Sequence, residues 1–303
     1  MVAFSHSVIG HNHIKKGQPN QDASLCVKDK AYTFLAVADG HGGDRYFRSD
    51  VGSRIAVESA RECMTSSTVI IALKKPAREK ERENIILQLK KSIVSRWNTL
   101  VSDHIDANPF TDDELGGISE KHAERYRAGE QIEAAYGSTL IAALLTDTFL
   151  LVMQIGDGNC VAVDNAGVFA MPVPACEKSF GNVTASLCDK DVIESFRHSY
   201  GNIPLAAVLI GTDGIDDCFA GAEKLYGFYR VILSSFAEKD GETAKTELID
   251  YLPRLSEKGS GDDISIGMIA DIDLLRNISF ETEPETPEPD ISDDETNEPN
   301  EGG

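Results

Sequence analysis

The rest of the chain is arranged around the stretch Phe34-Leu-Ala-Val-Ala-Asp-Gly-His-Gly-Gly43. The first five residues of this stretch are apolar and typical of a buried strand, and an acid, a histidine and three glycines follow directly. Glycine has no side chain and adopts backbone angles closed to other residues, so this loop leaves room for a cation or a phosphate beside His41. The stretch therefore predicts a buried strand that ends in a reactive loop. Taken alone, it is also compatible with a simple turn in which Asp39 caps a backbone group.

The same pattern, an apolar strand followed by glycine or threonine and then aspartate, recurs later in the chain. Residues 150–155 lead into Asp157, residues 205–210 lead into Asp213, and the pair Asp262 and Asp263 precedes the apolar run at 264–269. Acids placed at several strand ends indicate that their carboxylates converge on one site. The alternative is that each acid forms a turn or caps a helix, as Asp217 would do for a helix that follows it.

Together with Gln21 and Asp22, these motifs resemble in content and order the signature of the metal-dependent serine/threonine protein phosphatases of the type 2C class. The resemblance covers roughly residues 1–272. It implies an α+β fold, a four-layer αββα sandwich in which two stacked antiparallel β-sheets are flanked by α-helices. We expect a phosphatase domain over residues 1–275 and a tail over 276–303. Its prolines and acids from residue 281 on cannot bury enough apolar surface to order that part.

The resemblance also implies roles for individual residues. It makes Asp39 the carboxylate that bridges two cations. Asp22 and the Gly40 carbonyl are expected to bind the first of these cations, and Asp213 and Asp262 the second. Asp157 and Asp217 are expected to bind a third, weaker cation. His41 matches the general acid that protonates the departing serine or threonine oxygen, and Asp263 is expected to orient its loop. Since all these ligands are oxygens, Mn²⁺ or Mg²⁺ is expected. A water that bridges two such cations is the nucleophile this family would use on a phosphomonoester.

The chain departs from the pattern of that family at three positions. Gln21 stands where glutamate is usual, Asn159 replaces an arginine, and Gly17 occupies the place of the arginine that grips the substrate phosphate. The neighbouring Lys15 and Lys16 are candidates to supply that positive charge, although both are equally compatible with solvated loop lysines. A catalytically weak or inactive adaptor that binds phosphoproteins or a kinase is therefore the alternative to an active phosphatase.

Composition limits the possible partners. The net charge of −21 argues against nucleic acid and anionic membranes, because binding phosphates needs a basic face, and it also disfavours a nuclease. Residues 281–303 hold ten Asp or Glu and neither Lys nor Arg, so this acidic tail carries −10 and the body −11. The six cysteines are scattered, and no stretch reads as a signal peptide or membrane span. We expect a cytoplasmic monomer whose partners are phosphoserine or phosphothreonine proteins and a cognate kinase.

Hydrophobic periodicity predicts the remaining elements. Apolar residues four apart from Phe47 predict one helix, and the stripe over residues 86–101 predicts another, with Trp97 in the core, after a linker at 65–76. Residues 106–129 are polar with glycine and proline, so we predict a loop insertion there. Residues 2–9 and 24–27 are expected to form a hairpin, and 137–163 an antiparallel meander.

Overall fold

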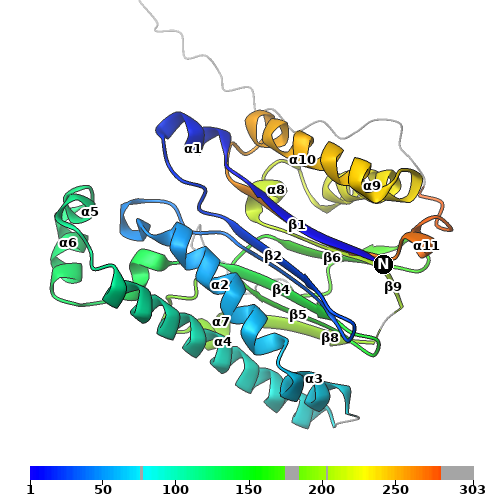
Figure 1. Cartoon of the computed structure of the whole chain (residues 1–303), viewed down its shortest axis with the longest axis horizontal. Helices are drawn as coiled ribbons and strands as arrows, with labels where there is room; N and C mark the ends of the chain where they lie inside the picture. The colour runs from blue at the N-terminus through cyan, green and yellow to red at the C-terminus, as the bar shows by residue number, and fades with distance from the viewer. Residues whose placement is uncertain (76–77, 175–183, 203, 281–303) are drawn as a thin grey trace, which may run out of the picture.

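Two five-stranded sheets form the centre of the computed structural model, which describes residues 1–75, 78–174, 184–202 and 204–280 (Figure 1). Neighbouring strands are antiparallel in both sheets. The first sheet has the order β1 (Val2–Val8), β10 (Ile264–Ala270), β9 (Leu205–Gly211), β6 (Asn159–Asp164) and β7 (Phe169–Ala170). The second has the order β2 (Ala23–Lys28), β3 (Thr33–Ala38), β4 (Leu140–Leu145), β5 (Leu150–Ile155) and β8 (Arg197–Gly201).

Helices cover the outer face of each sheet (Figure 1). The second sheet is covered by α2 (Ser49–Met64) and α4 (Glu79–Ala107), with α3 (Ser67–Lys74) and α7 (Val192–Ser195) beside α4. The first sheet is covered by α9 (Ala222–Glu238), α10 (Gly241–Lys258) and α11 (Ile272–Leu275). This four-layer αββα arrangement confirms the α+β fold that the sequence predicted.

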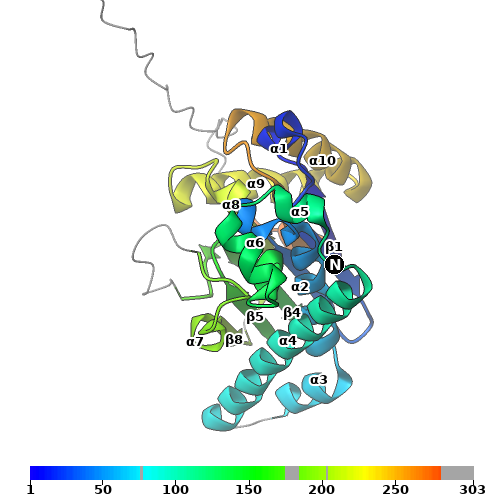
Figure 2. The same cartoon turned by 90° about the vertical axis from the view of Figure 1, so that its left-hand side faces the viewer.

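The short helices α1 (His11–Lys16), α5 (Asp112–Gly116), α6 (Glu120–Arg127) and α8 (Asp213–Asp216) gather at one end of the sandwich, as Figure 2 shows. Two 3-10 helices, η1 (Asp44–Tyr46) and η2 (Ile132–Tyr136), complete the described elements. Among the described helices, none combines the length and the apolar character that a membrane span requires.

The β3 strand is buried on both faces, which explains its unbroken apolar run. Leu35 and Val37 pack between the two sheets, whereas Phe34 packs under the helices of the second sheet. The same helical layer holds Trp97, which is fully buried and donates a 3.1 Å hydrogen bond from Nε1 to the carbonyl oxygen of Gly52. Trp97 is therefore a core residue, as predicted.

Antiparallel pairing in the second sheet brings its acids to one edge. Ala23 pairs with Ala38, so Asp22, which precedes β2, lies next to Asp39, which follows β3. The end of β5 lies opposite the start of β4, which places Asp157 at the same edge. The register, not the distance along the chain, makes these three acids neighbours.

The first sheet places its acids at the corresponding edge. Gly211, at the end of β9, pairs with Ile266 near the start of β10 and with Asn159 at the start of β6. Asp213 follows Gly211 by two residues, and Asp262 precedes β10 by two. Both therefore lie at the end of the sandwich where α1 and α8 are found.

Two predicted strand pairings are wrong. β1 pairs with β10 and β2 with β3, so residues 2–9 and 24–27 lie in different sheets, joined through α1, and form no hairpin. β4 and β5 pair as predicted for residues 137–163, but β6 pairs with β9 in the first sheet. Apolar runs cannot reveal which sheet a strand joins when both of its faces are buried.

The predicted loop over residues 106–129 is also wrong. The α4 helix runs to Ala107, and α5 and α6 follow. Thr111 begins α5 with a capping box, in which its N–H donates to the Glu114 carboxylate at 2.8 Å and its hydroxyl accepts from the Glu114 N–H. The predicted linker at 65–76 likewise contains α3. Polar composition concealed these helices, because only a few of their residues reach the core.

The domain limit at residue 275 remains a prediction, and the acidic tail from residue 281 lies outside the described residues. The described cysteines are free, namely Cys26, Cys63, Cys160, Cys188 and Cys218, and Cys176 lies outside the described residues.

Candidate active site

Three carboxylates meet at the end of the sandwich where α1 and α8 lie. One oxygen each of Asp39, Asp157 and Asp213 lies within 4.8 Å of the other two. Asp39 and Asp157 extend from the second sheet and Asp213 from the first, so this group joins the two sheets. Two oxygens bound to one Mg²⁺ lie at most about 4.2 Å apart, twice the bond length of about 2.1 Å. The observed spacing is therefore close to that of a ligand set.

Burial and mutual repulsion disfavour the charged forms of these acids. Burial is the main cause that raises the pKa of Asp39 and of Asp22 well above the ordinary range, and neighbouring aspartates raise both further. Burial, followed by the charges of Asp157 and Asp262, raises the pKa of Asp213 to about 7. A divalent cation offsets both effects, because it stabilises ionised carboxylates around it. The donor set thus fits a cation such as Mg²⁺ or Mn²⁺.

Asp262 belongs to a second group of possible ligands. One ligand atom each of His13, Asp262 and Asp263 lies within 4.8 Å of the others. The Asp262 side chain is half exposed, and its charge raises the pKa of both Asp39 and Asp213. The structure thus brings Asp262 to the same end of the molecule, beside a histidine that the sequence analysis missed. No local pattern could reveal His13, because its partners lie almost at the other end of the chain.

Asp263 holds the N-terminal loop in place, in agreement with the orienting role expected for it. Its carboxylate accepts hydrogen bonds from the N–H of Gly10 at 2.6 Å, the N–H of Gln21 at 2.6 Å and Nδ1 of His13 at 2.9 Å. The side chain is almost fully buried. Both ends of the segment that contains α1 are therefore fixed to the start of β10.

Gln21 and Asp22 turn in different directions. The Gln21 amide donates from Nε2 to Oγ of Ser49 at 2.8 Å, so it contacts the start of α2. The Asp22 carboxylate accepts from Oγ1 of Thr212 at 2.8 Å, and Thr212 directly precedes Asp213. Asp22 is thus linked to the acid-bearing loop of the first sheet.

The backbone around Asp39 is fixed by its neighbours. The N–H of Asp39 donates to Oγ1 of Thr139 at 2.9 Å, and the N–H of Thr139 donates to the carbonyl of Asp39 at 2.8 Å. A Cβ at Gly40 would lie 2.5 Å from the carbonyl oxygen of Ser49 and 2.6 Å from that of Gln21. Glycine is required at position 40 because the chain passes so close to other backbone.

His41 is restrained on its backbone and on its ring. Its N–H donates to the carbonyl of Gly137 at 3.1 Å, and its ring meets the ring of Tyr46 edge to face, with 5.0 Å between centroids. Burial lowers the pKa of His41 and the charge of Arg45 lowers it further, whereas the charges of Asp157 and Asp189 raise it. Among the described residues, its buried Nε2 has no hydrogen-bond partner. An exchangeable proton position is therefore held ready beside the carboxylates.

Asp216 is a partly buried acid that the sequence analysis missed. Burial raises its pKa to about 7, and its Oδ1 accepts from Nδ2 of Asn159 at 2.5 Å. Asn159 in turn accepts from the hydroxyl of the buried Tyr229 at 2.6 Å. Asn159, where the family has arginine, thus ties β6 to α8 and α9. The signal was present in the sequence as a further acid in the stretch that begins with Thr212.

Asp217 and Asp157 lie at the outer part of this end. Asp217 ends α8, and the next helix, α9, begins after Gly221, so Asp217 does not cap it as the alternative proposed. Burial raises the pKa of Asp217, and the charge of Asp157 raises it further. The exposed Asp157 carboxylate accepts from Oγ1 of Thr184 at 2.6 Å.

The two lysines considered for phosphate binding lie on α1. Lys15 and Lys16 form its last turn, and both are exposed. Their helix is placed beside the acids through His13, which lies in the same last turn. The structure therefore brings them near this end of the sandwich and leaves their amino groups in solvent.

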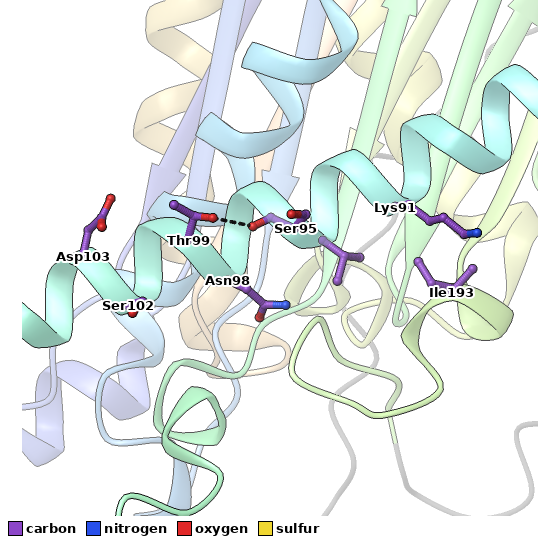
Figure 3. Close-up of a pocket in the computed structure, with 8 residues that line it drawn as sticks. Lys91, Ser95, Asn98, Thr99, Ser102, Asp103 and Ile193 are labelled. Carbon is purple, nitrogen blue, oxygen red and sulfur yellow. Dashed lines mark hydrogen bonds between the residues drawn. The ribbon is translucent and has the colours of Figure 1, made fainter.

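A separate cavity of about 610 Å³ opens along the outer side of α4 (Figure 3). Most of its lining residues are polar, and they include Lys91, Asn98 and Asp103 of α4, with Ile193 contributed by α7. Its lining includes none of the carboxylates described above. We therefore assign the chemistry to the acid-bearing end of the sheets and not to this groove.

Comparisons with known proteins agree with this fold. The chain is similar in structure to the serine/threonine phosphatase Stp1 from Staphylococcus aureus, with 14% identity, a TM-score of 0.55 and coverage of 89% of this chain and 94% of that one. It is also similar to PppA, a regulatory component of the type VI secretion system in Pseudomonas aeruginosa, with 17% identity, a TM-score of 0.53 and coverage of 89% and 97%.

The catalytic domain of the phosphatase PstP, solved with two manganese ions, matches with 14% identity, a TM-score of 0.50 and coverage of 88% and 96%. At these identities the likeness shows the fold alone. No curated protein is detectably similar to the chain in sequence.

The family model described as protein phosphatase 2C matches residues 9–253, which is most of the chain. This match confirms both the resemblance drawn from the motifs and the enzyme class that they predicted, a protein phosphatase. The chain belongs to the protein phosphatase 2C family.

Proposed function

We propose that the chain removes phosphate from phosphoserine and phosphothreonine in proteins, and that it requires Mn²⁺ or Mg²⁺. The observation that carries this proposal is the convergence of Asp39, Asp157 and Asp213 within 4.8 Å beside a restrained histidine. Oxygen ligands without sulfur favour these hard cations over zinc. The two manganese ions in the structure of PstP support a pair of cations here.

In this proposal one cation would be held by Asp39, Asp22 and the carbonyl of Gly40, and a second by Asp39, Asp213 and Asp262. Asp157 and Asp217 would hold a third. When bound, such cations would supply the positive charge needed to activate water and to neutralise the phosphoryl oxygens. The residues of the chain fix where that charge lies, because the backbone of Asp39 is tied to Thr139 and the side chain of Asp22 to Thr212.

His41 is proposed as the general acid. Its unpartnered Nε2 donates a proton to the oxygen of serine or threonine as the bond to phosphorus breaks. The Gly137 carbonyl and the Tyr46 ring keep the imidazole in place, so the proton is delivered from a fixed position. Burial lowers the pKa of His41, and the nearby charges of Asp157 and Asp189 oppose that shift in favour of the protonated ring.

The test is phosphate release from phosphoserine and phosphothreonine peptides by the full chain. We expect release to depend on added Mn²⁺, to stop with EDTA, and to fall at least about a hundredfold in Asp39→Asn, because an amide cannot replace a bridging carboxylate. Asp147→Asn, an exposed acid in the turn between β4 and β5, is the matched control and should keep full activity. Parental activity in Asp39→Asn would overturn the assignment.

A second candidate, an adaptor that binds phosphoproteins without turnover, is favoured by one observation. Gln21 stands where the family has glutamate, and its amide is bonded to Ser49. Titration calorimetry with Mn²⁺, followed by an assay on an aryl phosphate, separates the two candidates. Metal binding without turnover supports the adaptor, and turnover excludes it.

A further inference from the structure

We propose that the guanidinium of Arg45 binds the phosphate group of the substrate, an inference that rests on the phosphatase function proposed above. A phosphate monoester is an anion that must enter a site lined with carboxylates, on a chain with a net charge of −21. A fixed cation near the proton donor would reduce that repulsion, and arginine matches phosphate with two parallel hydrogen bonds.

The ring of Tyr46 contacts the side chains of both Arg45 and His41. The Cζ of Arg45 is 5.1 Å from the centroid of the Tyr46 ring, and that ring is 5.0 Å from the ring of His41. Tyr46 therefore touches both the cation and the proposed proton donor. A substrate that contacts both groups would therefore lie along the ring of Tyr46.

The Arg45 guanidinium is not committed to an acid. Within residues 1–75, 78–174, 184–202 and 204–280, its side-chain contact is the cation–π contact with Tyr46. Its neighbour Asp44 is directed elsewhere, since its carboxylate accepts from the N–H of Ser119 at 2.9 Å. Several other arginines in the described chain are paired with acids, as in Arg48–Glu114, Arg54–Asp50, Arg61–Glu58, Arg96–Glu62 and Arg127–Glu120.

Two groups at this site thus have donors without an acceptor among the described residues, the guanidinium of Arg45 and, in its protonated form, Nε2 of His41. A phosphorylated side chain offers acceptors to both, through the phosphoryl oxygens and the ester oxygen. Because a phosphorylated side chain supplies the acceptors that both groups lack, we assign Arg45 a role in ligand binding and do not treat it only as a solvated charge.

The backbone of Arg45 is held from the insertion that contains α5 and α6. The Tyr126 hydroxyl donates to the carbonyl oxygen of Arg45 at 2.7 Å, and Ser119 donates to the preceding residue, Asp44. The side chain therefore leaves a fixed point of η1. The insertion would act on substrate binding through the placement of this residue.

Lys15 and Lys16 are the competing cations. Both are exposed in the last turn of α1. The same turn contains His13, which lies close to Asp262 and Asp263. An ammonium group on a flexible stem offers no bidentate fork, so a loss of charge there should matter less.

The experiment compares Arg45→Gln, Arg45→Lys, the double variant Lys15→Ala/Lys16→Ala and Arg54→Ala in the full chain with Mn²⁺. Arg54 is an exposed arginine whose removal changes the net charge equally. We measure KM and kcat for a phosphopeptide and, by calorimetry, the Kd of inorganic phosphate. The Arg45→Gln variant should raise KM and the phosphate Kd at least about tenfold, and Arg45→Lys should raise both less. Arg54→Ala should change neither.

Unchanged KM and phosphate Kd in Arg45→Gln, with active wild-type protein, overturn the Arg45 assignment and leave the phosphatase function standing. A tenfold rise in KM and in the phosphate Kd that occurs only in the double lysine variant would lead to the same conclusion. Wild-type protein that neither turns over phosphopeptides nor binds phosphate overturns the proposed function together with this inference. Circular dichroism of each variant keeps a folding defect from being counted as a binding effect.

Discussion

The guanidinium of Arg48 donates two hydrogen bonds to the carboxylate of Glu114, from Nε to Oε1 at 2.7 Å and from Nη2 to Oε2 at 2.8 Å. The same guanidinium donates to the carbonyl of Asn108 and to the hydroxyl of Tyr136. Arg48 is buried at the start of α2, so this contact joins three segments that are far apart in sequence. It connects the α5 insertion with the residue that precedes Gly137, the acceptor for the backbone of His41.

Replacing Arg48 with lysine tests whether this contact stabilises the fold. Lysine keeps the charge but cannot satisfy two carboxylate oxygens, a carbonyl and a hydroxyl at once. We expect the free energy of unfolding to fall by about 2–3 kcal/mol in urea denaturation. Arg54→Lys, in the exposed pair with Asp50, is the control and should change it by less than about 0.5 kcal/mol. Equal effects at the two sites would contradict the role of the buried fork.

The same contact predicts a pH dependence. The hydrogen bonds from Arg48 are the main cause that lowers the pKa of Glu114 from 4.5 to about 2. Because the folded pKa is the lower one, the contribution to stability is complete above pH 4.5 and is lost as the pH falls toward 2. The difference in unfolding free energy between wild type and Glu114→Gln should therefore be constant near neutral pH and shrink below pH 4.5. A difference that grows on acidification would contradict this linkage.

How much of the molecule the sequence could predict depends on where the controlling contacts lie. The strand at 33–38 and its acid could be found because an unbroken apolar run and a glycine loop are local signals. The convergence of Asp39, Asp157 and Asp213 could be expected only from motif order, since it depends on the registers of two sheets. His13 had no local signal at all, because it pairs with Asp263 from the other end of the chain.

The failed predictions share one cause. Residues 2–9 and 24–27 are both strands, but each finds its partner elsewhere, and local alternation carries no information on that choice. The helices within 106–129 are short and mostly exposed, and they are held by Arg48 and by a capping box rather than by an apolar stripe. A search for the spacing between Thr111 and Glu114 would have located the start of α5.

Gly52 allows the backbone of α2 to lie close to the backbone of η2, and replacing Gly52 tests whether this close contact is needed. A Cβ at position 52 would lie 1.8 Å from the carbonyl oxygen of Tyr136, so alanine forces the helix and the backbone apart. We expect Gly52→Ala to lower the free energy of unfolding by at least about 3 kcal/mol. Gly116→Ala, in open space on α5, is the control and should be neutral or stabilising by up to about 1 kcal/mol. Equal stability of the two variants in denaturant would show that α2 can shift without cost.

Asp263 offers the sharpest test of how the N-terminal segment is held. Its two oxygens accept three hydrogen bonds. In Asp263→Asn, an NH₂ group replaces one of these oxygens, so at least one of the three donors faces another donor in place of an acceptor. We expect the free energy of unfolding to fall by about 1–3 kcal/mol, because at least one buried N–H loses its partner. Asp164→Asn is the matched control, since a single oxygen of Asp164 accepts from both Ala166 and Val168 and the amide of asparagine retains such an oxygen. Amide hydrogen exchange should also speed up at Gly10 and Gln21 in Asp263→Asn but not in Asp164→Asn. Unchanged exchange at both amides would mean that α1 is held by other contacts.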